Sequence, residues 1–516
     1  MTKERKKSDH RTVPKKGGNA PGGIAVTASK QAGQLRLFGE TADSPRGAIA
    51  GADRDQSLSA PRVVPKSQKR KRTALPAMTM EEVASEENLR KAFSQVASNK
   101  GAPGPNGQSI EKVRKHLNDT LPRVQEELLK GSYCPGHIRR VWIPKPGGQR
   151  GLGIPDVIDR WLQQAVHQVL SPHYEPTFHP SSHGFRPGRS CHTAIAEAKA
   201  YVEEGYDWVV DLDLEKFFDQ VSHQRLLAKL EQRVQDRRLL VLIRRMLKAK
   251  VVMLDGVVVN NEEGVPQGGP LSPLLSNIVL DELDRELERR AHRFSRYADD
   301  SKIYVKSERS GHRVMESITR FIEGRMGLKV NRGKSAVARP EDRHFVGFRL
   351  KRDPQDGHVE VLLSQRSKAR IYKKIRELTP RNYGQSLSSC IRRLNAYLLG
   401  WIEFFKVCTR GEKRMFQALS AHVRRRLRAL ILRQWKRKRT IVKRLIKLGI
   451  RPGTAWRQVY QGARRLWALS HCHAVDRALN NAHFAALGLL NLADEWEQRQ
   501  SQDIVTVRGQ LKLALG

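Results

Sequence analysis

Apolar and polar positions change their period along the chain, and the change separates predicted helices from predicted strands. Apolar residues at helical spacing predict helices around 89–96, through Val113–Leu129, and over 157–170, 223–248, 273–290 and 311–326. Short apolar runs bounded by turn residues predict strands or hairpins at Ile138–Ile143, 207–214, 250–260, 294–305 and 344–362. Helices and strands therefore mix over the first part of the chain, and acidic residues stand at strand ends. The prediction is an α+β unit.

The composition changes past Ser364. Residues 363–470 hold 29 basic and 3 acidic residues, and their apolar residues recur at helical spacing. This pattern predicts a basic helical domain. Across all 516 residues the net charge is +42, which is hard to reconcile with a neutral substrate and favours a polyanionic partner.

Residues 1–75 carry 17 basic and 6 acidic residues with little apolar periodicity. They are predicted to form a disordered basic tail, which either keeps the protein soluble or serves as an RNA-binding arm. The sequence has no apolar stretch of 18 or more residues and opens without a signal peptide, and its five cysteines form no C-x-x-C pair. We therefore expect a soluble cytoplasmic protein without a disulfide framework or a cysteine zinc site.

Acidic residues in two predicted strand regions are the strongest chemical signal. Asp299 and Asp300 stand between two short strands, where a tight turn can aim both at one divalent cation. Acidic pairs at turns are commonly solvated turn formers, but Asp213 stands at the end of another strand. Three oxygen ligands from two strands suit Mg²⁺, and two such ions stabilise phosphoryl transfer.

These residues lie in segments that resemble a known family. Phe294–Asp300 is similar to the polymerase hairpin of reverse transcriptases, and Gly264–Asn277 is very similar to a loop and helix of group II intron reverse transcriptase/maturases. Further resemblance, over about 78–490, lies in Lys100–Gly107, Ile143–Pro146, Gly151–Pro155, Asp159-Arg160, Gly184–Gly188, Leu328–Asn331 with Lys334, and Phe345–Phe348. It indicates the bacterial type without a zinc-linked endonuclease domain, so target cleavage would need another route, such as priming from existing DNA ends.

The resemblance implies a role for each matching site residue. It makes Asp213, Asp299 and Asp300 the catalytic metal ligands, with Asp211 as a supporting strand residue. Nucleotide binding is implied for Lys145 and Arg150 at the triphosphate, Phe218 beneath the deoxyribose, Gln267 and Gly268 where the backbone comes close, and Lys334 at the leaving pyrophosphate. Departures from the family pattern are Asn106, Gly151 and Asp156, and none of them removes a metal ligand.

The basic segment resembles the thumb and maturase region of the same family over 364–440. RNA binding is implied for Arg424, Arg425, Arg426, Lys436, Arg437 and Lys438, whereas Trp401 and Phe405 are expected in the core. The implied organisation is a right-hand polymerase with a mainly antiparallel palm sheet. It has a tail (1–75), fingers and palm (76–362), a helical thumb/maturase domain (363–445) and a C-terminal helical region that is a candidate for DNA binding (446–516).

The expected function is that of an RNA-directed DNA polymerase of a group II intron. It would copy intron RNA into cDNA with two Mg²⁺ ions, which Mn²⁺ could replace, and would bind the intron RNA to assist splicing and mobility. Its expected partners are intron RNA, an RNA template with a DNA primer, dNTPs and target DNA. The alternatives are a maturase acting mainly in splicing and a domesticated or defence-associated bacterial reverse transcriptase.

Overall fold

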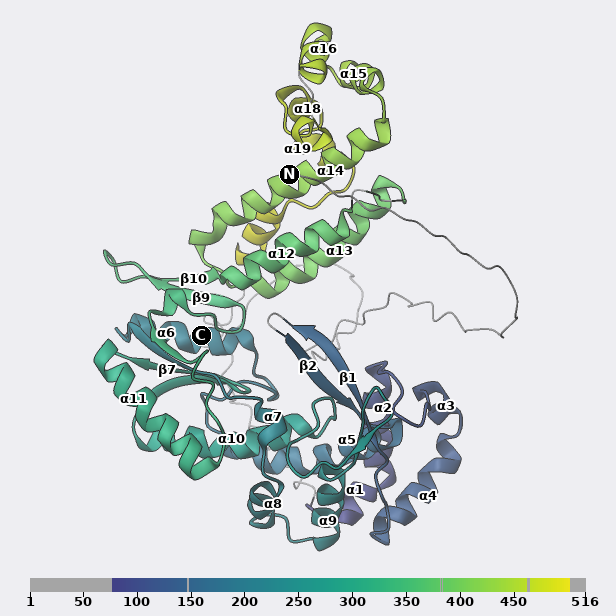
Figure 1. Cartoon of the computed structure of the whole chain (residues 1–516), viewed down its shortest axis with the longest axis vertical. Coiled ribbons are helices and arrows are strands. Elements are labelled where there is room, and N and C mark those ends of the chain that lie inside the picture. Colours follow the sequence, from purple (N-terminus) through teal and green to yellow (C-terminus); the bar gives the residue numbers. More distant parts are fainter. Residues whose placement is uncertain (1–76, 146–147, 381, 383, 462–464, 502–516) are drawn as a thin grey trace, which may run out of the picture. The chain divides into compact units, whose positions relative to one another are not determined.

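The computed structural model describes residues 77–145, 148–380, 382, 384–461 and 465–501, and gives no side chain for Lys145 (Figure 1). The predicted basic tail therefore lies outside the described residues. No helix in the described ranges is long and apolar enough to cross a membrane.

Helices make up the first part of the described chain. They are α1 (Met80–Ala84), α2 (Glu86–Ser98), α3 (Ile110–Lys115), α4 (Leu117–Leu129) and α5 (Val157–Tyr174). Where one helix was predicted over Val113–Leu129, the chain breaks at His116, and α3 and α4 follow each other. The long hairpin β1 (Ile138–Lys145) and β2 (Gly148–Ile154) joins the short strands β4 (Val251–Val252) and β5 (Val258–Val259) in a first sheet, ordered β2-β1-β4-β5.

A second sheet, the central sheet, has the order β6-β7-β3-β8 and is antiparallel throughout. Its strands are β3 (Trp208–Leu212), β6 (Arg293–Tyr297), β7 (Asp300–Val305) and β8 (Ala336–Ala338), and the helices beside it are α6 (Cys191–Glu203), α10 (Ser272–Arg289) and α11 (Glu308–Phe321). Side chains alternate along a strand. Val210 therefore belongs to the core that includes α5, α10 and α11, and Val209 to a second core that includes α6.

The single helix predicted over 223–248 is wrong. The structure has the short α7 (Phe217–Gln220), then α8 (His223–Glu231) and α9 (Arg237–Leu247). Asp236 ends the continuity because its carboxylate accepts hydrogen bonds from the backbone N–H groups of Arg238 and Leu239, which caps α9. The apolar spacing continues across the break, so periodicity alone hides it.

The second core continues into the basic segment. The hairpin β9 (Phe348–Arg352) and β10 (Val359–Leu363) contributes to it, and so do helices on both sides of residue 445. The helices that follow β10 are α12 (Gln365–Leu378), α13 (Leu387–Phe405), α14 (Lys413–Trp435), α15 (Lys438–Lys447), α16 (Pro452–Tyr460), α17 (Leu466–Leu469), α18 (His473–Ala478) and α19 (Asn481–Ala486). The fold is thus the predicted α+β class followed by a helical region (Figure 1).

Candidate active site

Antiparallel pairing of β3 with β7 brings the predicted metal ligands to one edge of the central sheet. Asp211 pairs with Lys302 and Leu212 with Ser301, so Asp213 leaves β3 beside the start of β7. Tyr297 pairs with Asp300 across a turn that holds only Ala298 and Asp299. Residues 86 positions apart in sequence thereby share one edge.

The backbone of Asp213 is held by the segment before β8. The Asn331 N–H donates to the Asp213 carbonyl at 2.8 Å, and the Asp213 N–H donates to the Ser335 hydroxyl at 3.0 Å. The Lys334 ammonium lies 3.1 Å from the Asp213 carboxylate. Lys334 is therefore next to a predicted metal ligand, as a role at the leaving pyrophosphate requires.

The pKa of the Asp299 carboxyl is raised by its surroundings. Burial raises the pKa of its carboxyl, and the nearby Asp213 raises it further, although its own backbone N–H, Arg150 and Arg296 act in the opposite direction. Within the described ranges Asp299 forms no salt bridge. A desolvated carboxylate beside a second carboxylate is a suitable ligand for a hard divalent cation, so Asp213 and Asp299 fit the metal that the sequence predicts.

Asp300 has a different partner. Lys302, two residues along the same strand, donates to the Asp300 carboxylate at 2.6 Å and also to Asp211. Arg343 donates to Asp211 from the other side at 2.7 Å. Burial raises the pKa of Asp300, and Lys302 opposes this rise.

Among the described residues, no three Asp, Glu, His or Cys side chains converge as a ligand cluster. Lys302 shares the strand face of Asp300 and pairs with its carboxylate, as Lys334 pairs with Asp213. That Asp299 and Asp300 aim at one cation together with Asp213 stays a prediction. Asp211 forms ion pairs with Lys302 and Arg343, as expected of a supporting residue.

Arg296 stabilises the turn that carries Asp299. This guanidinium is fully buried with Asp284, donates to it at 2.7 Å, and donates to the carbonyl oxygen of Ala298 at 2.8 Å. Ala298 has a positive φ of 56°, a backbone conformation that residues other than glycine rarely adopt. Gly184 packs against this strained residue so closely that a Cβ atom there would lie 2.2 Å from the Ala298 nitrogen.

Sequence reasoning missed Arg296 and Lys302 as supporting residues. A usable signal existed, because each is a cation within a strand whose neighbours are buried. A charge at such a position needs a buried partner of opposite sign. Which acid would supply that partner was not visible from the sequence.

The structure describes the surroundings of most of the predicted nucleotide-binding residues. Arg150 is exposed on β2, and its charge lowers the pKa of Asp299, whereas the Lys145 side chain lies outside the described residues. Phe218 is half-buried against Phe217, with ring centroids 5.3 Å apart.

Gly268 lies so close to β2 of the first sheet that the position calls for glycine. The Gly153 N–H donates to the Gln267 carbonyl at 2.8 Å, and a Cβ atom on Gly268 would lie 2.4 Å from the Gly153 oxygen. The loop that carries Gln267 is thereby fixed to β2. The prediction that it contacts the nucleotide stays a prediction.

The six predicted RNA-binding cations fall into two groups. Lys436, Arg437 and Lys438 are exposed at the junction of α14 and α15. Arg424, Arg425 and Arg426 are half-buried: Arg425 stacks on the Trp467 ring at 4.3 Å, and Arg426 donates to the Thr379 hydroxyl at 2.9 Å. Trp401 and Phe405 are buried, as expected.

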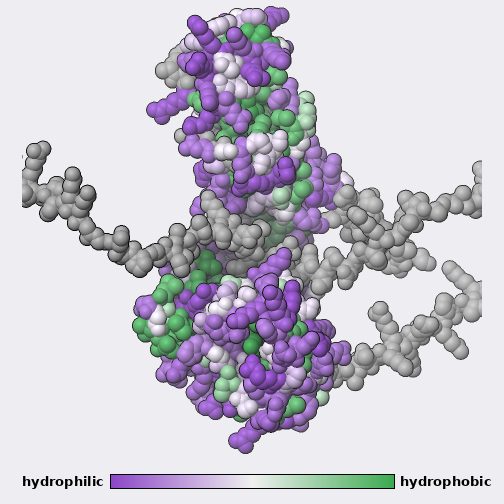
Figure 2. All heavy atoms as spheres, turned by 90° about the vertical axis from the view of Figure 1, so that its right-hand side faces the viewer, coloured by the Kyte–Doolittle hydropathy of each residue, from purple (hydrophilic) through white to green (hydrophobic). Residues whose placement is uncertain are grey.

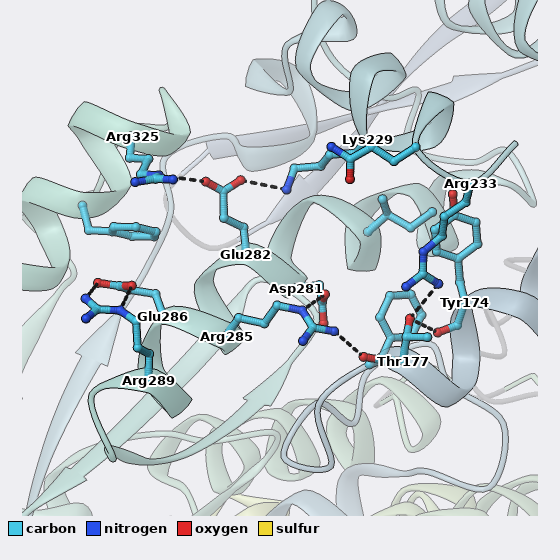
Figure 3. A pocket seen from close by; sticks show the side chains of 14 residues that line it. Tyr174, Thr177, Lys229, Arg233, Asp281, Glu282, Arg285, Glu286, Arg289 and Arg325 are labelled. Carbon is cyan, nitrogen blue, oxygen red and sulfur yellow. Dashed lines mark hydrogen bonds and ion pairs between the residues drawn. The ribbon is translucent and has the colours of Figure 1, made fainter.

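A pocket of about 860 Å³ lies between the end of α5, α8 and the second half of α10, and none of Asp213, Asp299 and Asp300 lines it (Figure 3). Its charges pair with one another: Lys229 lies 2.8 Å from Glu282, and Arg285 lies 2.7 Å from Asp281. Arg233 is the exception, because it donates to the Thr177 hydroxyl at 3.2 Å and lies over the Tyr174 ring instead of meeting a carboxylate.

Two family models match the chain. The first, described as reverse transcriptase (RNA-dependent DNA polymerase), matches residues 143–350 and includes all three aspartates. The second, described as group II intron, maturase-specific domain, matches residues 368–447. Their order along the chain is that of the α+β unit and the basic helical region.

Individual proteins show the same likeness. Protein YkfC of Escherichia coli (strain K12) is 32% identical over 345 residues, which cover 59% of this chain and 88% of that protein. The group II intron-encoded protein LtrA of Lactococcus lactis subsp. cremoris is 36% identical over 212 residues, 40% of this chain but only 34% of LtrA. In a solved partial Cas6-RT-Cas1–Cas2 complex, one chain is 25% identical with a TM-score of 0.32, covering 47% of this chain and 42% of that one.

Reverse transcriptases use divalent metal ions, which agrees with the chemistry of Asp213 and Asp299. The maturase-specific domain binds RNA, which agrees with the charge of the helical region. The chain therefore belongs to the family of group II intron reverse transcriptases, RNA-directed DNA polymerases in which a right-hand polymerase is followed by a maturase domain.

Proposed function

We propose that the protein extends a DNA primer on an RNA template at the edge formed by Asp213, Asp299 and Asp300, and that two Mg²⁺ ions are held there. The observation that carries the proposal is the gathering of these carboxylates at one edge of the central sheet, where Asp213 leaves β3 beside the turn that carries Asp299 and Asp300. Bound Mg²⁺ would stabilise the charge on the attacking and leaving oxygens of nucleotidyl transfer.

The chain's own residues supply binding and orientation. Arg150, whose charge lowers the pKa of Asp299, attracts the triphosphate of the incoming dNTP. Lys334, held beside Asp213, is placed to donate a hydrogen bond to the leaving pyrophosphate. Phe218 supports the deoxyribose from below, where a 2′-hydroxyl would clash with its ring.

The same protein binds its intron RNA, and we propose that it assists splicing and mobility through the basic helical region. The exposed group Lys436, Arg437 and Lys438 supports phosphate contacts, because each cation at a phosphate releases condensed counterions. Target DNA is the proposed second nucleic-acid partner. Two of the similar proteins are bacterial, which supports a bacterial origin, and we propose a cytoplasmic protein associated with nucleic acid.

Primer extension on an RNA template with Mg²⁺ tests the proposal. Asp299→Ala and the double variant Asp299→Ala/Asp300→Ala are expected to lose at least about a hundredfold in extension rate, since a preorganised charge stabiliser is removed. Asp119→Ala is the matched control, because Asp119 is an exposed aspartate in the first turn of α4. If folded wild-type protein extends no primer, the polymerase proposal fails and a maturase acting mainly in splicing becomes the better account.

A further inference from the structure

Arg140 and Asp219 join the first sheet to the short helix α7. The Arg140 guanidinium on β1 donates to the Asp219 carboxylate at 3.4 Å, although the two residues are 79 positions apart in sequence. The Arg140 side chain is only 18% exposed, and its guanidinium also lies over the Trp142 ring, 5.1 Å from the centroid. We call Arg140 and Asp219 the bridging pair. Neither residue has a role in the function proposed above.

The bridging pair differs from the local ion pairs of the chain. Hydrophilic side chains cover much of the face that Figure 2 shows, and ion pairs on such a surface often link neighbouring turns of one helix, as Arg90 and Glu86 do on α2. Pairs of that kind contribute little to stability. The bridging pair connects two separate elements instead, so its loss changes how a helix is positioned relative to a sheet.

The chain leaves room for the Arg140 guanidinium by having glycine at position 151. Gly151 lies on β2, the strand paired with β1, and it is one of the three departures from the family pattern. A Cβ atom there would lie 2.3 Å from the Arg140 Nε atom. Since this distance is much shorter than a van der Waals contact, any larger residue at 151 displaces the guanidinium. The long Arg140 side chain can move aside without a change in either strand.

Each side of the bridging pair carries a residue proposed to hold the nucleotide. Arg150 stands on β2, in the same hairpin as Arg140, and Phe218 is the direct neighbour of Asp219 in α7. Because α7 has only four residues, its position depends on contacts with other elements. The bridging pair is such a contact, and it links α7 to the hairpin that carries Arg150.

We propose that the bridging pair makes the polymerase select deoxyribonucleotides over ribonucleotides by fixing the position of Phe218. This rests on the proposed function, in which Arg150 attracts the triphosphate and the Phe218 ring lies beneath the deoxyribose. A ring excludes a 2′-hydroxyl only while it stays at a fixed distance from a sugar whose phosphates are held elsewhere. The bridging pair maintains that distance, so Arg140 and Asp219 are positioning residues that act through Phe218.

Primer extension with a dNTP and with the matching rNTP measures this selection as the ratio of the two kcat/KM values. We expect Arg140→Met and Asp219→Asn to lower the ratio at least about fivefold, because small displacements at a reacting site are costly. The exchange variant Arg140→Asp/Asp219→Arg restores an ion pair and is expected to recover most of the ratio. A merely structural role would lower both kcat/KM values alike and leave the ratio unchanged. Arg90→Met is the control, because it removes an exposed local pair on α2.

Gly151→Ala tests the geometry without removing a charge. Its methyl group displaces the Arg140 guanidinium, so we expect a similar fall in the ratio at an unchanged melting temperature. Gly400→Ala is the matched control, since a Cβ atom at that position has no heavy atom within 4 Å.

Two results would overturn the inference while leaving the polymerase proposal intact. One is a wild-type ratio in both Arg140→Met and Asp219→Asn, measured on folded protein. The other is a ratio that falls in Arg140→Met but stays at the wild-type value in Asp219→Asn and Gly151→Ala, since Arg140 would then act without its partner. Wild-type protein that extends no primer with either nucleotide would refute the proposed polymerase itself.

Discussion

At the scale of single residues, Lys302 and the carboxylates around it show how neighbouring acids come to differ. Burial alone would lower the pKa of Lys302, but Asp300 and Asp211 more than offset this, so its pKa is raised and the ammonium stays charged. Asp300 is thereby neutralised internally, whereas Asp299 is not. The two adjacent aspartates thus differ: Asp300 pairs with Lys302, and Asp299 forms no salt bridge among the described residues.

Removing the internal cation should cost stability. Lys302→Met leaves Asp300 with no ammonium and Asp211 with Arg343 alone, so we expect the free energy of unfolding to fall by about 3–5 kcal/mol. Urea denaturation measures this. Lys306→Met is the control, because Lys306 is exposed at the end of the same strand and its loss should change stability by at most about 0.5 kcal/mol. Equal stability of the two variants would contradict the buried role of Lys302.

Asn106 and Asp156, two of the departures from the family pattern, contact each other. The Asn106 N–H donates to the Asp156 carboxylate at 3.1 Å, and the Asn106 side-chain oxygen accepts from the Gln108 N–H at 2.9 Å. Burial raises the pKa of Asp156. An aspartate at 106 would bring a second negative charge to this turn, so the neutral amide suits the acid opposite it.

At the scale of elements, the β6–β7 hairpin depends on the loop that carries Gly184. Asn277 donates to the Gly184 carbonyl at 2.9 Å, and Asn277 also accepts from Arg296. One buried network therefore joins the loop, α10 and the strained turn. A strained residue persists only where its surroundings hold it, and here they hold Ala298 next to Asp299.

Gly184→Ala is the sharpest perturbation of this hairpin. Its Cβ atom would lie 2.2 Å from the backbone of Ala298, so either the loop or the turn must move. We expect stability to fall by about 1–3 kcal/mol and primer extension to fall at least about tenfold, because Asp299 moves with the turn. Gly400→Ala is the matched control, since nothing lies within 4 Å of a Cβ atom at that helical position. Full extension by Gly184→Ala would show that the hairpin tolerates displacement.

At the scale of the whole molecule, the chain has two hydrophobic cores, but most of its net charge lies on the part that surrounds the second core. One hydrophobic core joins the first helices to one face of the central sheet, and the other joins the opposite face to the helices after β10. The regions predicted as 363–445 and 446–516 share this second core: Phe416 stacks on Trp496 with ring centroids 5.1 Å apart. Most of the net charge lies on the helices that this core supports.

The salt dependence of RNA binding should report this charge. For single-stranded RNA, the logarithm of the binding constant falls linearly with the logarithm of salt concentration, by about 0.7 per neutralised phosphate. Lys436→Ala/Arg437→Ala/Lys438→Ala should therefore reduce the slope by roughly 2. Filter binding over a salt series measures it. The triple variant Arg309→Ala/Arg313→Ala/Arg320→Ala removes three exposed cations of α11 and should leave the slope unchanged.

The sequence by itself determined the α+β class, the strand ends that carry Asp213 and Asp299, and the basic helical region. These features depend on local signals, because hydrophobic period, turn residues and charge density act over a few positions. Only the tertiary structure decided that Lys302 neutralises Asp300, that Arg296 holds the turn, that Arg426 bonds to the end of α12, and that Trp456 and Tyr460 stay exposed. Most of these outcomes depend on partners far away in sequence, or on which helix face the core leaves uncovered. Packing alone selects those partners and faces.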